Sequence, residues 1–108
     1  MRYDIAIIGG GPGGYVGAIV GAQQGFKVVL IERDALGGTC LNRGCISTKS
    51  WIRDSRQFYQ TVSSSVLKGA ENVTFDAPGM LLRKEKVVST LVGGVGSLLK
   101  SNGVDVIN

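Results

Sequence analysis

The sequence predicts an α/β protein built on a doubly wound parallel sheet, and three features support this prediction. Residues 3–8 and 27–31 form short, nearly continuous apolar runs, typical of strands buried on both faces of a parallel sheet. A glycine-rich turn and a segment of small and apolar residues lie between the two runs. An acid, Glu32, follows the second run. Strand, glycine turn, helix, strand and acid occur in this order within about thirty residues, as in a βαβ unit.

The turn after the first predicted strand has the spacing Gly-x-Gly-x-x-Gly, at Gly9, Gly11 and Gly14. The first glycine of such a turn permits the sharp bend, the second admits a pyrophosphate and the third lets helix and strand approach closely. The N-terminus of the helix then favours the negative charge of the phosphates. We expect this helix to cover residues 15–24 and to end at Gly25. The whole pattern predicts a Rossmann-like fold that binds an ADP-containing cofactor.

Glu32 closes the second strand, where it is expected to accept hydrogen bonds from the adenosine ribose hydroxyls. A carboxylate at this position disfavours a 2′-phosphate, which argues against NADP at this site. The alternative for Glu32 is a solvated strand end without a ligand.

The two cysteines of the chain, Cys40 and Cys45, lie in the glycine-rich stretch 37–49 and predict a redox-active dithiol. A structural zinc site is disfavoured because the chain has no histidine and no second cysteine pair. On an unbroken helix these positions would lie roughly 8 Å apart, beyond the roughly 7 Å that a disulfide spans. We therefore expect Cys40 in a turn before a helix, or a distorted first turn, which Gly44 allows. The positive end of that helix should lower the pKa of the thiols. Two inert, buried cysteines or a structural staple remain the alternative.

The remainder of the chain is predicted to be mainly helical. Apolar residues at intervals of three and four indicate a helix over residues 50–67, followed by a loop over 68–79. A further helix is expected from about Pro78 to Ser101, capped by Asn102 and Gly103. Residues 104–107 then begin another strand.

Composition excludes several other classes of protein. The chain of 108 residues is 44% hydrophobic, enough for one modest core but not for two domains. Its net charge of +4 is spread over separate segments with few aromatic residues, which disfavours nucleic-acid binding. No run is long and apolar enough for a membrane span, and Asp4 and the glycine cluster interrupt any signal peptide. Two cysteines in 108 residues fit a soluble protein of the reducing cytoplasm.

Three segments together resemble one enzyme family. They are the glycine loop continued as Tyr15-Val16, the Ile31-Glu32 end of the second strand, and the stretch from Gly37 through Cys45 to Lys49. These segments resemble the N-terminus of the flavin-dependent pyridine nucleotide-disulfide oxidoreductases. Tyr15-Val16 and residues 41–44 are most similar to the dihydrolipoamide dehydrogenases within that family, rather than to glutathione or mercuric reductases. The strongest similarity covers residues 1 to about 56.

The resemblance implies FAD as cofactor, with its pyrophosphate at the glycine loop, its ribose at Glu32 and its isoalloxazine beside the cystine. The residues implied to contact FAD are Gly9, Gly11, Pro12, Gly13, Gly14, Glu32, Arg33, Gly38, Thr39, Cys40, Cys45 and Lys49. The resemblance also implies that Cys45 faces the flavin and that Cys40 exchanges with dihydrolipoamide. Electrons would pass from dihydrolipoamide through the disulfide and FAD to NAD⁺, with no metal involved.

The same resemblance implies a longer parent enzyme. Residues 1–108 correspond to the N-terminal portion of its FAD-binding domain, without the NAD and interface domains, and the chain alone is expected to be inactive. The parent would be a homodimer that acts on dihydrolipoamide or on a lipoyl domain of a 2-oxoacid dehydrogenase complex. Ser47 stands where the family usually has proline, so the bend after Cys45 should be less rigid. Two alternatives remain, a nucleotide-binding module without turnover and a related reductase of another disulfide.

Overall fold

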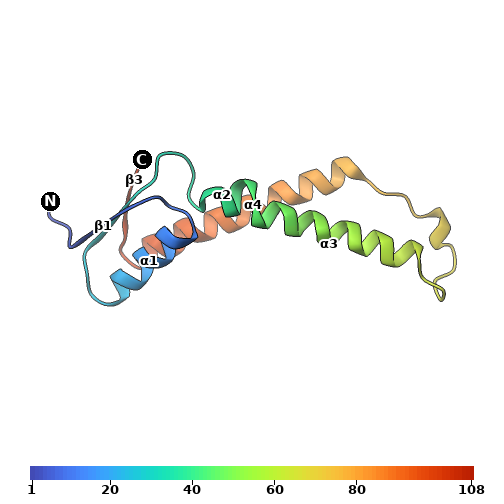
Figure 1. Cartoon of the computed structure of the whole chain (residues 1–108), viewed down its shortest axis with the longest axis horizontal. Coiled ribbons are helices and arrows are strands. Elements are labelled where there is room, and N and C mark those ends of the chain that lie inside the picture. Colours follow the sequence, from blue (N-terminus) through green and yellow to red (C-terminus); the bar gives the residue numbers. More distant parts are fainter.

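The computed structural model describes residues 1–108, and its helices and strands follow the predicted order (Figure 1). The elements are β1 (Ile5–Ile8), α1 (Pro12–Gln23), β2 (Val28–Ile31), α2 (Gly38–Arg43), α3 (Cys45–Val62), the 3₁₀ turn η1 (Ala70–Asn72), α4 (Ala77–Ser101) and β3 (Asp105–Ile107). None of the helices combines the length and the apolar character that a membrane span requires.

The three strands form one parallel sheet in the order β1-β2-β3. Ile5 pairs with Val28, and Val29 pairs with Asp105, so β2 is the central strand. Parallel neighbours need crossover connections, which α1 supplies between β1 and β2 and the segment α2 to α4 supplies between β2 and β3. The predicted parallel α/β sheet is therefore confirmed.

The core lies where α1 and α4 pack on one face of the sheet. Ala18 of α1, Val28 and Leu30 of β2, and Val95 and Leu99 of α4 are buried in one cluster. The opposite face carries no helix, and Ile8 on that face is 87% exposed. The prediction of strands buried on both faces therefore holds for the first three residues of β2 but is wrong for β1, whose residues alternate between half-buried and exposed.

Glycines end both helices that lead into strands. Gly25 follows α1 with φ +90°, and Gly103 follows α4 with φ +74°, both in the left-handed region that favours glycine. The backbone N–H of Phe26 donates to Gly21 O, and that of Val104 donates to Leu99 O, as in a Schellman motif. Both predicted helix ends are confirmed. Helix α1 begins at Pro12, three residues earlier than predicted, because proline suits the first helical position.

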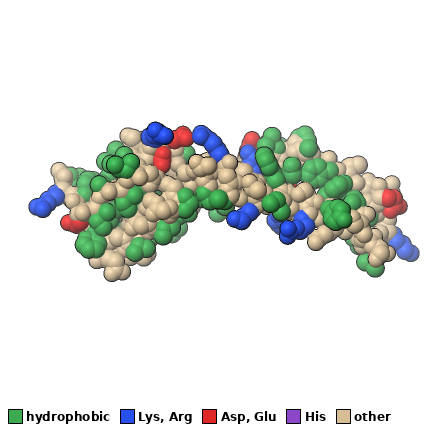
Figure 2. Space-filling view, in the orientation of Figure 1, with side chains coloured by type: hydrophobic (Ala, Val, Ile, Leu, Met, Phe, Trp, Pro, Cys, Tyr) green, Lys and Arg blue, Asp and Glu red, His purple; other side chains and the backbone are tan.

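Helices α3 and α4 form a long antiparallel hairpin that extends away from the sheet (Figure 1). The molecule measures 64 × 24 × 17 Å, and its radius of gyration is 19.2 Å, against about 13 Å for a compact chain of similar length. The Arg83 Nε and Asp54 Oδ1 atoms lie 3.4 Å apart between the two helices, and the rings of Phe58 and Phe75 pack at 5.2 Å. Apolar side chains nevertheless stay exposed along the hairpin and at the sheet (Figure 2).

The end of α3 differs from the prediction. The helix stops at Val62 rather than at residue 67, and residues 63–65 that follow are all serine. Serine hydroxyls compete for backbone hydrogen bonds, and here Ser64 Oγ accepts from the N–H of Val66. The predicted helix was too long because its apolar periodicity included Val66. That side chain is 84% exposed and does not pack as part of a helix face.

Candidate functional site

The glycine loop joins β1 to α1 in a strained and close geometry. Gly9 has φ +104°, in the left-handed region, and its N–H donates to Ile31 O at 2.8 Å. A Cβ at Gly14 would collide with the carbonyl oxygen of Gly9, so α1 approaches the end of β1 as closely as backbone atoms allow. A Cβ at Gly13 would meet nothing within 4 Å, which leaves that side of the loop open.

The N-terminus of α1 offers unpartnered donors to an anion. The first amides of a helix have no intrahelical partner, and Gly11 at the N-cap provides no side chain to satisfy them. Pro12 at N1 has no N–H, so the amides of Gly13 and Gly14 remain, and the first turn contains no acid that would neutralise the helix dipole. These features fit a pyrophosphate at the open side of the loop.

Glu32 ties the end of β2 to the glycine loop. Its Oε2 accepts from the N–H of Gly10 at 2.7 Å, and its Oε1 accepts from the N–H of Asp34 at 2.8 Å. These hydrogen bonds hold the pKa of the Glu32 carboxyl below its ordinary value, and the bond from Gly10 has the largest effect. The carboxylate is buried, so it is not the solvated strand end that remained as an alternative.

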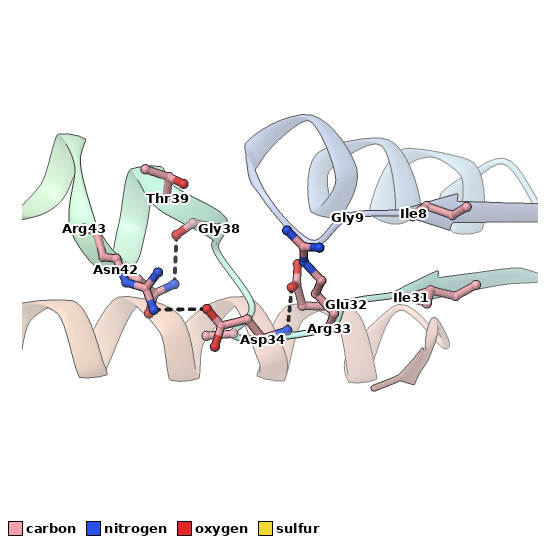
Figure 3. A pocket seen from close by; sticks show the side chains of 11 residues that line it. Ile8, Gly9, Ile31, Glu32, Arg33, Asp34, Gly38, Thr39, Asn42 and Arg43 are labelled. Carbon is pink, nitrogen blue, oxygen red and sulfur yellow. Dashed lines mark hydrogen bonds and ion pairs between the residues drawn. The ribbon is translucent and has the colours of Figure 1, made fainter.

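A cavity of about 440 Å³ opens beside this carboxylate, between the ends of β1 and β2 and the start of α2 (Figure 3). It is lined by Ile8, Gly9, Ile31, Glu32, Arg33, Asp34, Ala35, Gly38, Thr39, Asn42 and Arg43. The structure thus brings together five of the residues that the resemblance implied, Gly9, Glu32, Arg33, Gly38 and Thr39. Gly11, Pro12, Gly13 and Gly14 lie at the adjoining helix start, whereas Cys40, Cys45 and Lys49 lie outside the cavity wall.

Gly10, within the glycine loop expected to hold the pyrophosphate, also anchors Glu32, and Asp34 and Asn42 were not expected as site residues. Gly10 donates to Glu32 through its N–H and accepts at its carbonyl from the N–H of Gly37 at 2.8 Å. Asp34 and Asn42 line the cavity. The position of Asp34 just beyond the carboxyl end of a parallel strand could have indicated it, because ligands of open α/β sheets bind there.

The two cysteines lie on either side of a helix break. Cys40 is in α2, and Cys45 is the first residue of α3, with Gly44 between the helices at φ −134° and ψ −111°. The expected distortion at Gly44 is therefore present, but Cys40 lies within a short helix rather than in a turn. Cys40 is half-buried and Cys45 is exposed, and both are free thiols.

The expected decrease in thiol pKa is wrong for Cys40. Its pKa is raised above the ordinary value, first by the hydrogen bond between its thiol and that of Cys45 and then by burial. The backbone N–H of Cys45 and the charge of Lys49 act in the opposite direction without outweighing these effects. Helix α3 therefore does direct its first amide at the sulfur of Cys40, but the neighbouring sulfur dominates.

Lys49 lies one turn into α3 and is exposed. It borders a shallow surface groove with Arg53 and Arg56 rather than the cavity near Glu32. Ser47 is buried in the first turn of α3 and continues the helix without a kink. The chain contains no cluster of acidic or cysteine side chains that would hold a metal ion.

We expect Glu32→Gln to lower the thermal midpoint at pH 7 and to flatten the acid limb of the stability curve. A carboxylate with a lowered folded-state pKa stabilises the fold above its unfolded pKa, and this contribution is lost as pH falls from about 4.3 through the folded value. Glutamine does not titrate, so the variant should lose less stability over that range. Thermal unfolding followed by circular dichroism from pH 3 to 7 measures both effects. Glu85→Gln on the exposed face of α4 is the control, and an equal response from both variants would contradict the role of Glu32.

The sequence model described as pyridine nucleotide-disulphide oxidoreductase matches residues 3–108. The chain belongs to this family. Dihydrolipoyl dehydrogenase from Acholeplasma laidlawii is 50% identical over 110 residues, which cover 99% of the chain and 32% of that relative. The pea mitochondrial dihydrolipoyl dehydrogenase is 48% identical over 104 residues, covering 94% of the chain and 21% of its own length.

Solved structures show the same fold. LpdA from Mycobacterium tuberculosis superposes with a TM-score of 0.86 at 26% identity, over 95% of the chain and 22% of that protein. A copper(II) complex of RclA, an HOCl-induced flavoprotein disulfide reductase from Escherichia coli, has a TM-score of 0.79 at 32% identity, over 99% of the chain and 21% of RclA. The chain thus spans about a third or less of the relatives that it matches.

Proposed function

We propose that the chain forms the N-terminal portion of the FAD-binding domain of a dihydrolipoyl dehydrogenase, with Cys40 and Cys45 as its redox-active disulfide. The observation that carries this proposal is the close approach of the dithiol segment to the glycine loop. A Cβ on Gly38, two residues before Cys40, would lie 2.8 Å from the Cα of Gly11. This contact supports a site in which a pyrophosphate at Gly11 would lie near the cysteine pair. The relatives named dihydrolipoyl dehydrogenase support the same assignment.

FAD fits the site that the residues build. Gly11, Pro12, Gly13 and Gly14 would hold its pyrophosphate at the start of α1, and Glu32 and Arg33 would hold the adenosine in the cavity of about 440 Å³. Gly9, Gly38 and Thr39 complete the wall between these two parts. The flavin would supply the electron-transfer chemistry when bound.

The two thiols perform the exchange with substrate. A thiolate of dihydrolipoamide attacks the sulfur of Cys40 in the disulfide, forms a mixed disulfide and displaces Cys45 as a thiolate. The second sulfur of the substrate then attacks the first, which releases lipoamide as a cyclic disulfide and leaves the Cys40 thiolate to take up a proton. Substrate loses two electrons and the protein disulfide gains them. The raised pKa of Cys40 favours uptake of a proton by this thiolate once lipoamide has been released.

Lys49 is assigned a separate role as a fixed positive charge near the flavin. Its charge acts to lower the pKa of Cys40, which supports a role near the dithiol. Lys49→Met should therefore slow flavin reduction while leaving the cofactor bound, and stopped-flow reduction kinetics measure this. Unchanged kinetics would leave Lys49 as a surface lysine of α3.

The proposal extends to an electron acceptor, a substrate carrier and an assembly that involve more than this chain. NAD⁺ would be the final acceptor, a lipoyl domain of a 2-oxoacid dehydrogenase complex the substrate carrier, and a homodimer the working assembly. The reducing cytoplasm is the compartment in which a catalytic rather than a structural cysteine pair is expected. The base that takes the proton from the dithiol substrate must come from outside residues 1–108, because the chain has no histidine. Histidine is the residue whose ordinary pKa lies near ~6.5.

A chimaera tests the function. Residues 1–108 should replace the matching segment of the Acholeplasma laidlawii dihydrolipoyl dehydrogenase, with which they align at 50% identity. We expect the purified chimaera to be yellow and to reduce NAD⁺ with dihydrolipoamide, whereas the 108-residue chain alone should show no such turnover. A folded chimaera without flavin absorbance after reconstitution would refute the proposal. Bound flavin without any dithiol oxidation would favour the nucleotide-binding module, and activity confined to another disulfide would favour a related reductase.

A further inference from the structure

Asn42 makes two hydrogen bonds at the junction between the dithiol and the glycine loop. Its Nδ2 donates to Leu36 O at 3.0 Å and to Gly38 O at 2.9 Å. Both acceptors belong to the turn that begins α2, and the second bond is drawn in Figure 3. Asn42 is half-buried, so one amide group uses both of its hydrogens to fasten this turn.

The turn that Asn42 holds is in direct contact with the glycine loop. Gly37 and Gly38 have φ +94° and +60°, two successive left-handed residues. The N–H of Gly37 donates to Gly10 O, and Gly38 lies so close to Gly11 that an added Cβ would lie 2.8 Å from the Cα of that residue. Any movement of this turn therefore moves the start of α2 relative to the loop.

Helix α2 has six residues, too few to be stable by its own hydrogen bonds. Its position depends on tertiary anchors, of which Leu41 buries its side chain in the core and Asn42 fastens the preceding turn. Cys40 lies between Gly38 and Asn42, the two residues joined by the side-chain bond. Gly44 separates it from Cys45, the first residue of α3.

We propose that Asn42 is a positioning residue for the dithiol, which holds α2 between the glycine loop and α3 so that Cys40 stays in register with Cys45. The inference rests on the redox role proposed for the two thiols. It requires neither flavin nor turnover, so it can fail or hold independently of the cofactor assignment.

Equilibration of the purified chain with glutathione tests this role. In each oxidation the two thiols form one S–S bond, one glutathione disulfide is cleaved, and the two protons pass to the two glutathione thiols that are released. Asn42→Asp removes both donors and places a carboxylate against two carbonyl oxygens. We expect the equilibrium constant for the Cys40–Cys45 disulfide to fall at least about tenfold, because two hydrogen bonds are lost and a tenfold change is about what one of them contributes. For this two-electron couple a tenfold fall corresponds to about 30 mV.

Asn102→Asp is the matched control. Asn102 also donates through Nδ2 to a backbone carbonyl, Leu98 O at 2.8 Å, but at the end of α4 away from the cysteines. It should lower the thermal midpoint without changing the glutathione equilibrium. An unchanged equilibrium in folded Asn42→Asp, or an equal change in both variants, would overturn the proposal. Should Asn42→Asp not fold, Asn42→Ala removes the donors without adding charge and is judged by the same two outcomes. A wild-type chain that forms no Cys40–Cys45 disulfide would instead count against the redox function itself.

Discussion

Gly14→Ala should destabilise the fold by roughly 3 kcal/mol or more, at the upper end of the range for overpacked positions. The added Cβ would meet the carbonyl oxygen of Gly9, a backbone atom that cannot move aside as a flexible side chain can. Relief would require α1 to shift away from the end of β1. That shift would also displace the amides that face the proposed pyrophosphate. Urea unfolding followed by circular dichroism, together with titration of FAD, measures both consequences.

The neighbouring glycine gives a close control. A Cβ at Gly13 meets nothing within 4 Å, and alanine in a helix is favoured over glycine by about 0.5–1 kcal/mol. Gly13→Ala should therefore keep or slightly raise the urea midpoint. Equal midpoints for Gly14→Ala and Gly13→Ala would show that the close approach of α1 and β1 does not limit stability.

Local sequence signals were sufficient for most of the elements near the site. The glycine turn and the glycines that close α1 and α4 depend on backbone conformations that few other residues adopt, and Glu32 directly follows the apolar run of β2. Their positions can therefore be predicted without knowledge of the tertiary structure. The spacing of Cys40 and Cys45 likewise required a break in the helix, and Gly44 supplies it.

What the sequence could not predict depends on contacts between distant segments. An apolar run does not reveal how many faces of its strand are covered, so β1 was expected to be buried on both faces although α1 and α4 cover only one. The hydrogen bonds from the Gly10 N–H to Glu32 and from Asn42 Nδ2 to Leu36 O arise only when the loop after β2 folds back on the glycine turn. The raised pKa of Cys40 has the same origin, because the proximity of the two sulfurs outweighs the helix dipole.

The two cysteines should prove unequal when each is replaced by serine in the chimaera. Cys40→Ser and Cys45→Ser should both reduce dihydrolipoamide oxidation by roughly 10⁴-fold or more, as expected when a catalytic nucleophile is removed. Their spectra should differ. The raised pKa of Cys40 favours the protonated form of that thiol, and the proposal makes Cys45 the sulfur that faces the flavin. Cys40→Ser should thus retain the long-wavelength absorbance of a thiolate beside oxidised flavin, and Cys45→Ser should lack it.

Absorbance spectra across a pH titration distinguish this assignment from its reverse. In Cys40→Ser the long-wavelength band should be present, and iodoacetamide should abolish it by alkylating Cys45. Ser47→Ala, which changes a side chain of the same turn of α3 without touching either thiol, is the control and should leave both the band and its pH dependence in place. Retention of the band in Cys45→Ser and its loss in Cys40→Ser would reverse the two roles. Identical spectra from both variants would mean that neither sulfur has a fixed position relative to the flavin, in which case the break at Gly44 does not orient the pair.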